Sequence, residues 1–298
     1  MYIIMALCPI CAETSGLGFW SFLKALIHAI VEGITEWLPV SSTGHLILLE
    51  KYLPLDLNPA LRELFLVIIQ MAAVLAVVFL FWNRLWPIKR QKELSERQIL
   101  IPLGPFALER SRMILILKLI VASIPAAIFG LLWADWFMEK LYTPLTVAIM
   151  LILLGIALYL VELKQPPVRL LRESEISYGT ALLIGCAQVL AAALPGTSRS
   201  GICILAALLL GLARPLAAEF SFFMAVPAMA GASLLEVLKL SYRPDLDEII
   251  LLAVACIASF LVSMLSIEGL MNFVKKHSFQ PFALYRIGLG LLVIALLS

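Results

Sequence analysis

EGITEWLPVSSTGH, at residues 32–45, sets two carboxylates, neighbouring hydroxyl groups and one imidazole into a strongly apolar sequence. A second stretch, LPGTSRSG at residues 194–201, interrupts another apolar segment in the same way. Proline removes a helix hydrogen bond and clashes with the preceding turn, and glycine adds backbone freedom. Each stretch therefore predicts a break between two short helices.

The composition is that of a membrane protein. Of the 298 residues, 62% are hydrophobic and only 14% are charged, whereas soluble domains carry about 25% charged residues. A very apolar soluble core is the alternative, but apolar runs recur along the whole chain. The net charge of +2 is too small to indicate a nucleic-acid partner, and residues 1–21 lack the basic start of a cleaved signal peptide.

Six apolar runs are long enough to cross a bilayer as helices, which takes about 20 residues. They are residues 64–82, 113–133, 143–163, 217–240, 249–270 and 281–297. The interrupted segments, 22–50 and 178–212, have halves too short to span alone. We expect each to be a broken, re-entrant hairpin, because irregular backbone survives at membrane depth only where protein or a wet cavity surrounds it.

The two halves of the chain resemble each other. Pro39 and Pro195 lie 156 residues apart, as do Pro125 and Pro281. Each half then reads as one broken hairpin followed by three spans, and three crossings bring the second copy in from the opposite face. The sequence predicts one all-α integral membrane domain, 1–298, with an N-terminal extension at 1–21 and an inverted-topology repeat of 22–163 and 164–298. Coincident prolines are the alternative.

Basic residues predict the orientation. Thirteen Lys and Arg residues fall on the face that carries loop 83–112, and six fall on the other face. The positive-inside rule makes the first face cytoplasmic and places both termini outside. The mixed charges of loop 83–112 predict a solvated segment.

The first break carries candidate chemistry. Glu32 and Glu36 share one helix face, and paired carboxylates at depth indicate a divalent cation, a proton relay or a general base. Ser41 and Ser42 suit either helix capping or phosphate binding. His45, one turn further on, suits a hydrogen-bonding tether or a proton carrier.

The second break reads as the other half of an anion site. The guanidinium of Arg199 matches phosphate oxygens, and the half-helices after both breaks offer free N–H groups. Two glutamates beside such a cradle call for a cation, Mg²⁺ or Ca²⁺, at Glu32 and Glu36. Together these groups describe phosphoryl transfer on a lipid. The candidate phosphate-binding residues are Ser41, Thr43, Thr197, Ser198, Arg199 and Ser200.

The two motifs resemble the signatures of the bacterial undecaprenyl-diphosphatase family, also called the bacitracin-resistance protein family. FLVIIQMAAVLAVV, EFSFFMAVPAM and PFALYRIGLG, at 65–78, 219–229 and 281–290, are similar to further family segments. The resemblance runs from about residue 22 to the end. It maps the family's catalytic residues onto Glu32, Glu36, Ser42, His45 and Arg199.

The resemblance implies hydrolysis of undecaprenyl diphosphate to undecaprenyl phosphate and inorganic phosphate. This reaction recycles the lipid carrier for peptidoglycan synthesis, and hence for cell-wall biogenesis and cell shape, and gives bacitracin resistance. It also implies a multi-pass protein of the bacterial plasma (inner) membrane, with the active site facing the periplasm or outer side.

Several alternatives stay open at this point. A transporter or flippase for the polyprenyl phosphate carrier suits the repeat but needs no nucleophile, and an ion channel explains neither the hydroxyls nor Arg199. Ser42 is expected to attack the phosphorus or to position water. Gln70 suits either a side chain that lines the site or an amide that tethers two packed helices. Lys118 and Arg286 are expected to snorkel or to pair with carboxylates such as Glu219. A homodimer is the alternative to a monomer.

Overall fold

A computed structural model describes residues 17–239 and 242–297, so most of the predicted extension 1–21 lies outside the described residues. Helices make up the body of the protein. They are α1 Phe19–Thr35, α2 Ser42–Tyr52, α3 Pro59–Leu80, α4 Trp82–Leu85, α5 Arg110–Leu141, α6 Pro144–Lys164, α7 Tyr178–Ala193, α8 Arg199–Leu209, α9 Arg214–Lys239, α10 Leu246–Val274 and α11 Gln280–Leu297.

Six of the described helices, α3, α5, α6, α9, α10 and α11, are long and apolar enough to cross a membrane, which confirms the six predicted runs. Most of their ends lie within a few residues of the hydropathy limits, α5 runs on to Leu141, and capping residues set the starts of α3 and α10. The Asn58 side chain accepts a hydrogen bond from the Leu61 backbone and starts α3. Asp245 and Glu248 form a capping box that starts α10.

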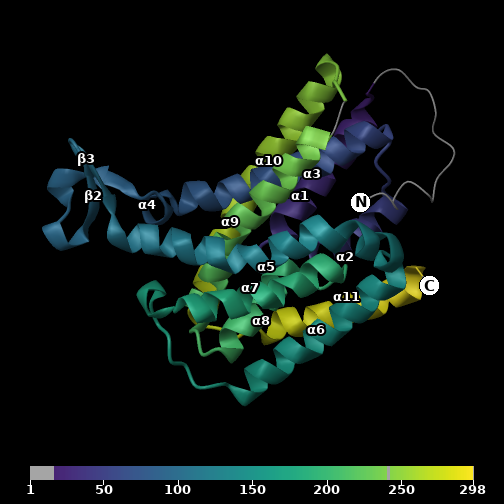
Figure 1. The fold of residues 1–298 in the computed structure, drawn as a ribbon. Coiled ribbons are helices and arrows are strands. Elements are labelled where there is room, and N and C mark those ends of the chain that lie inside the picture. The colour runs from purple at the N-terminus through teal and green to yellow at the C-terminus, as the bar shows by residue number, and fades with distance from the viewer. Residues whose placement is uncertain (1–16, 240–241, 298) are drawn as a thin grey trace.

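Both predicted breaks are present. The first separates α1 from α2 over residues 36–41, and the second separates α7 from α8 over residues 194–198. α1 packs along α10, α7 along α5, and α6 along α11 (Figure 1). The four half-helices are thus held among the long helices.

Loop 83–112 differs from the prediction, which was a solvated segment in an all-α chain. It contains an antiparallel sheet of β1 Ile88–Arg90, β3 Phe106–Glu109 and β2 Ile99–Leu103, in that order. Gly104, with a φ of 67°, and Pro105 form the tight turn between β2 and β3. In Figure 1 the sheet lies at one end of the molecule and the C-terminus at the other.

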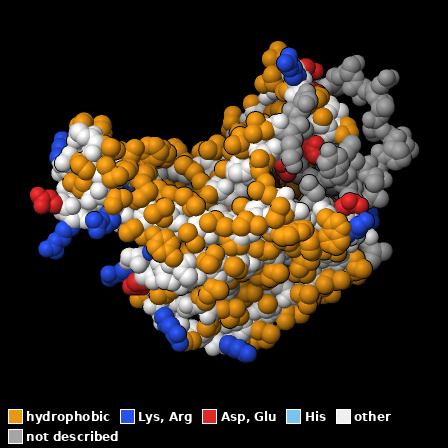
Figure 2. Space-filling view, viewed as in Figure 1, with side chains coloured by type: hydrophobic (Ala, Val, Ile, Leu, Met, Phe, Trp, Pro, Cys, Tyr) orange, Lys and Arg blue, Asp and Glu red, His pale blue; other side chains and the backbone are white. Residues whose placement is uncertain are grey.

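The segments that carry most basic residues gather at the sheet end. Arg84 forms ion pairs with Glu173 and Glu219 there, and Leu170 pairs with Leu212 through a backbone bridge. Figure 2 shows hydrophobic side chains over the middle of the molecule and many Lys and Arg side chains at the sheet end and lower margin. This distribution fits a bilayer around the middle and water at the ends.

The interior of the main core is aromatic. Phe220, Phe222 and Phe223 of α9 are at most 1% exposed. Trp37, at the first break, meets Phe222 edge to face with ring centroids 5.3 Å apart. The aromatic residues of the 219–229 segment therefore support the first break from behind.

Candidate active site

Both breaks end in the same unusual backbone geometry. Ser41 precedes α2 with a φ of 76°, and Ser198 precedes α8 with a φ of 66°. Positive φ is uncommon outside glycine and is maintained only where the surroundings enforce it. The Ser198 side chain caps α8 by accepting a hydrogen bond from the Gly201 backbone at 3.1 Å. Ser41 is buried and its hydroxyl has no partner, so capping by its side chain is not observed.

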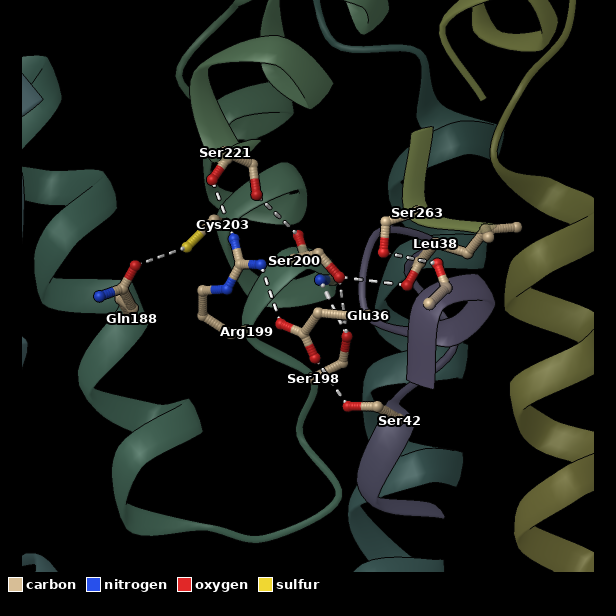
Figure 3. Close-up of polar contacts among 12 residues, drawn as sticks. Glu36, Leu38, Ser42, Gln188, Ser198, Arg199, Ser200, Cys203, Ser221 and Ser263 are labelled. Atoms are coloured by element: carbon tan, nitrogen blue, oxygen red, sulfur yellow. Dashed lines mark hydrogen bonds and ion pairs between the residues drawn. The ribbon is translucent and has the colours of Figure 1, made fainter. Parts of the chain in front are cut away.

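Glu36 joins the two breaks (Figure 3). Its Oε1 accepts a hydrogen bond from Arg199 Nη2 at 3.0 Å, and its Oε2 accepts one from Ser42 Oγ at 2.8 Å. A second Arg199 nitrogen, Nη1, donates to the Ser221 carbonyl at 2.9 Å. The guanidinium also lies over the Trp37 ring, 5.4 Å from its centroid. The carboxylate thus receives one bond from each predicted motif.

The remaining hydroxyls of the second break hold the loops in place. Ser200 Oγ donates to the Leu38 carbonyl at 3.1 Å and lies 3.2 Å from Ser198 Oγ. Thr197 Oγ1 donates to the Leu194 carbonyl at 2.6 Å. Ser200 and Thr197 are both buried, and each donates its hydroxyl proton to a backbone carbonyl.

A cavity of about 200 Å³ opens beside this network. Five of the predicted residues line it, and they are Glu36, Ser42, Thr43, Ser198 and Arg199. Gln70 of α3 also lines it, and so does Tyr142, which sequence reasoning missed. Burial raises the pKa of the Tyr142 hydroxyl to about 12. Tyr142 therefore stays protonated at neutral pH and can donate a hydrogen bond to a ligand.

Glu32 lies behind the cavity rather than in its lining. It is 4% exposed, and its Oε2 is buried without a hydrogen-bond partner. The described residues hold no cluster of three or more metal-ligating His, Cys, Asp or Glu side chains. Two glutamates still fit Mg²⁺, which commonly takes one or two carboxylates together with phosphate oxygens.

His45 is held by two contacts outside the Glu36 network. Its Nδ1 lies 2.7 Å from the Ser41 carbonyl, and its Nε2 lies 2.7 Å from the Tyr285 hydroxyl. Because a carbonyl only accepts, Nδ1 carries the proton in the neutral ring and Nε2 accepts from Tyr285. These two contacts are those of a hydrogen-bonding tether, the alternative to the catalytic role that was predicted for His45, and the cavity lining does not include this ring.

Arg286 of α11 is the main structural residue that the sequence prediction misplaced. Snorkelling or pairing with a carboxylate such as Glu219 was expected, but Arg286 is fully buried and Glu219 pairs with Arg84. The Arg286 guanidinium donates to the carbonyls of Pro39 at 3.3 Å and of Gly196 and Thr197 at 3.1 Å. It therefore ties the two breaks together. The available signal was an arginine within an apolar span.

Comparison with known proteins shows which family this chain belongs to. Residues 25–292 match the family model of the bacitracin resistance protein BacA. An undecaprenyl-diphosphatase of Desulfitobacterium hafniense is 44% identical over 92% of this chain and 95% of the relative. One of Enterococcus faecalis is 43% identical over 93% and 98%. An undecaprenyl-diphosphatase 1 of Clostridium acetobutylicum is 42% identical over 91% and 96%.

The family match covers both breaks and every residue of the Glu36 network. The relatives are similar over nearly their full lengths, so the likeness is not confined to one motif. This chain therefore belongs to the bacitracin resistance protein BacA family.

Proposed function

We propose that this chain hydrolyses undecaprenyl diphosphate to undecaprenyl phosphate and inorganic phosphate, and so recycles the lipid carrier of peptidoglycan synthesis. The observation that carries the proposal is the bridging of Ser42 and Arg199 by Glu36 at a cavity. The names of the relatives point to the same reaction. No feature of the described residues favours a transporter over the hydrolase.

The contact between Ser42 and Glu36 suggests how the reaction begins. Ser42 Oγ attacks the terminal phosphorus while its proton passes to the Glu36 carboxylate, which already accepts that hydrogen bond. The bond from phosphorus to the bridging oxygen breaks, and its electron pair leaves with undecaprenyl phosphate. Water then attacks the phosphoserine and releases inorganic phosphate. Direct attack by water held at Ser42 is the alternative, and a trapped phosphoserine would distinguish the two routes.

Arg199 is the cationic side chain that faces the phosphate in this scheme. Its planar fork already spans Glu36 and the Ser221 carbonyl, so it is preorganised before substrate arrives. The backbone N–H groups that begin α2 and α8 add further donors for the phosphate oxygens. Thr43, Ser198 and the protonated Tyr142 line the same cavity. Ser41, Thr197 and Ser200 shape the two turns that present these donors.

Glu32 and Glu36 would hold a divalent cation, Mg²⁺ or Ca²⁺. Such an ion would neutralise phosphate charge. The buried Glu32 Oε2 without a partner supports this assignment. His45 is proposed as the proton carrier, with Tyr285 at its Nε2 as the group that receives or returns the proton.

We also propose the inverted repeat and its re-entrant hairpins. α1, α2, α3, α5 and α6 would correspond to α7, α8, α9, α10 and α11. Under this pairing, the packing of α1 against α10 corresponds to the packing of α7 against α5. In both contacts a glycine lets the helices approach closely. A Cβ on Gly33 of α1 would meet the backbone of Ser259 in α10, and a Cβ on Gly185 of α7 would meet the backbone of Ala122 in α5. The equivalent cap serines, Ser41 and Ser198, support the same relation.

One sequence argument for the repeat was wrong in detail. Pro125 lies inside α5, the second span of its half, whereas Pro281 lies at the start of α11, the third span. The segment of α4 and the sheet lengthens the first half only. The hairpins themselves also need two offsets, because Pro39 and Pro195 lie 156 residues apart whereas Ser41 and Ser198 lie 157 apart. The repeat rests on packing and caps rather than on that proline pair.

The proposed setting is the bacterial plasma membrane with the site facing outward. Met138 and Tyr142, near the end of α5 away from the sheet, line the cavity, and the sheet end carries most of the basic residues that mark the cytoplasm. A homodimer remains a prediction, which light scattering of the protein in detergent tests.

The deciding experiment is release of phosphate from undecaprenyl diphosphate by the purified protein, with and without a chelator. We expect release that the chelator suppresses and that added Mg²⁺ or Ca²⁺ restores. No release with any divalent ion would refute the hydrolase. Phosphate release that the chelator leaves unchanged would refute the proposed need for a divalent cation but would support the hydrolase activity. Transport of the lipid without release would identify a transporter.

A further inference from the structure

A second and larger cavity, of about 570 Å³, lies at the sheet end of the molecule. The first turns of α5, residues 171–174 and the start of α9 line it. Lys118 lines this cavity and Met138 lines the one between the breaks. At 1.5 Å per residue these two lie about 30 Å apart along α5, whereas Glu219 and Met229 of α9, which line the second and the first cavity, lie about 15 Å apart. The second cavity is therefore separate from the proposed active site, near the opposite face of the membrane.

The charges around the second cavity do not balance. Four cations, Arg84, Arg112, Lys118 and Arg172, line it with three carboxylates, Glu109, Glu173 and Glu219. Each carboxylate forms an ion pair with an arginine. Glu109 pairs with Arg112, and Glu173 and Glu219 pair with Arg84.

Two of the four cations, Lys118 and Arg172, form none of these ion pairs, and of the two only Lys118 is buried. The unpaired buried cation is therefore Lys118. It is 5% exposed, and its Nζ donates to the Glu173 backbone carbonyl at 3.2 Å. None of the ion pairs of the described residues includes it. A buried ammonium without a counter-charge is costly, and it has three donors to satisfy. Arg112 adds a buried Nη1 without a hydrogen-bond partner, while Glu219 Oε1, on the side of the cavity where Glu219 pairs with Arg84, is a buried acceptor without one. The cavity thus presents unused cationic donors, which suit a phosphate group.

The wall of the cavity also includes apolar side chains that face outward. Ile114 and Leu171 are 37% and 68% exposed, and both line the cavity. Leu115 and Leu216 line it further in. A ligand with a phosphate at one end and a hydrocarbon chain at the other fits this division of the wall.

We propose that the second cavity binds the phosphate headgroup of a membrane lipid. Lys118 and Arg112 would hold the phosphate, Arg172 would lie at the rim, and the chain would leave past Ile114 and Leu171. This proposal does not depend on the hydrolysis proposed above, because it involves no residue of the cavity between the breaks.

The test is photolabelling of the purified full-length protein with a photoreactive farnesyl phosphate, followed by mapping of the labelled peptides. Mapping separates the two cavities directly. We expect label on residues 111–118 and 171–174, and Arg199→Ala should leave that label in place. Lys118→Met should weaken it about tenfold or more, as loss of a hydrogen bond to a charged group does. The matched control is Lys140→Gln, an exposed lysine at the far end of α5.

Three results would overturn the proposal. They are absence of label on these peptides, label that Lys118→Met leaves unchanged, and equal labelling by photoreactive farnesol, which lacks the phosphate. If inorganic phosphate at equal concentration competes completely, the cavity is a site for a free anion and the proposal of a lipid ligand is overturned. If Lys118→Met does not fold, Arg172→Gln replaces it, with several-fold weaker label expected and unchanged label contradicting the proposal.

Discussion

Replacing Glu36 by glutamine removes the charge that links the two breaks while keeping the side-chain shape. The carboxylate accepts from Arg199 at one oxygen and from Ser42 at the other. An amide has one acceptor oxygen, so one of these donors must face an NH₂ group. Ser42 also loses the group that takes its proton. We expect turnover to fall about 100-fold or more, a barrier increase of about 2.7 kcal/mol.

The same substitution should destabilise the protein, and this effect must be separated from chemistry. Breaking a buried ion pair costs about 3 kcal/mol at the lower end of the measured range. We expect less here, because the Ser221 carbonyl and the Trp37 ring still contact Arg199. Glu36→Asp should restore the charge but little turnover, since its shorter arm misplaces both oxygens.

Glu162→Gln is the matched control. Glu162 is 3% exposed and pairs with Arg214 at 2.6 Å, near the other end of α6 from the cavity. It should lower thermal stability without lowering turnover in the remaining folded protein. The assay is phosphate release per folded enzyme, beside a thermal melt. Near-normal turnover in Glu36→Gln, or an equal loss in Glu162→Gln, would refute the reasoning.

Three further perturbations test other parts of the account. Arg199→Lys keeps the charge but cannot span both of its partners, so turnover should fall about 100-fold or more. Equilibrium binding of undecaprenyl diphosphate should persist, and unchanged turnover would contradict the role proposed for the guanidinium. Arg286→Gln should lower the free energy of unfolding by about 1–3 kcal/mol, because carbonyls of both breaks lose their donor, and an unaltered melt would contradict this role. Cysteines at positions 95 and 275 should resist an impermeant reagent in intact cells, and strong labelling would reverse the orientation.

The sequence was sufficient to predict the six long helices and both breaks. Hydropathy over about 20 residues identifies a span, and Pro39 and Pro195 mark the interruptions. The ends of the helices moved because caps such as Asn58 and Asp245 act locally. The sheet at 88–109 was missed because its strands are three to five residues long, which is too short for alternation to stand out among charges.

The candidate site was predicted in part. Glu36, Ser42 and Arg199 meet as expected, because two motifs that carry complementary groups came together. The single point at which they meet was not predictable, since residues 36 and 199 are brought together only by tertiary packing. Arg286 was misplaced for the same reason, because its partners are backbone carbonyls of distant loops. His45 shares the first motif, yet its Nε2 bonds to Tyr285 of α11.

The central claim is that Ser42, set against Glu36 by the first break, performs the chemistry on a phosphate held by the second break. Its most direct test compares phosphate release from undecaprenyl diphosphate by wild-type protein and Ser42→Ala, with lipid binding measured on the same preparations. The account predicts release by the wild type, and a loss of about 100-fold or more in Ser42→Ala with binding retained. Turnover by Ser42→Ala close to that of the wild type would contradict it.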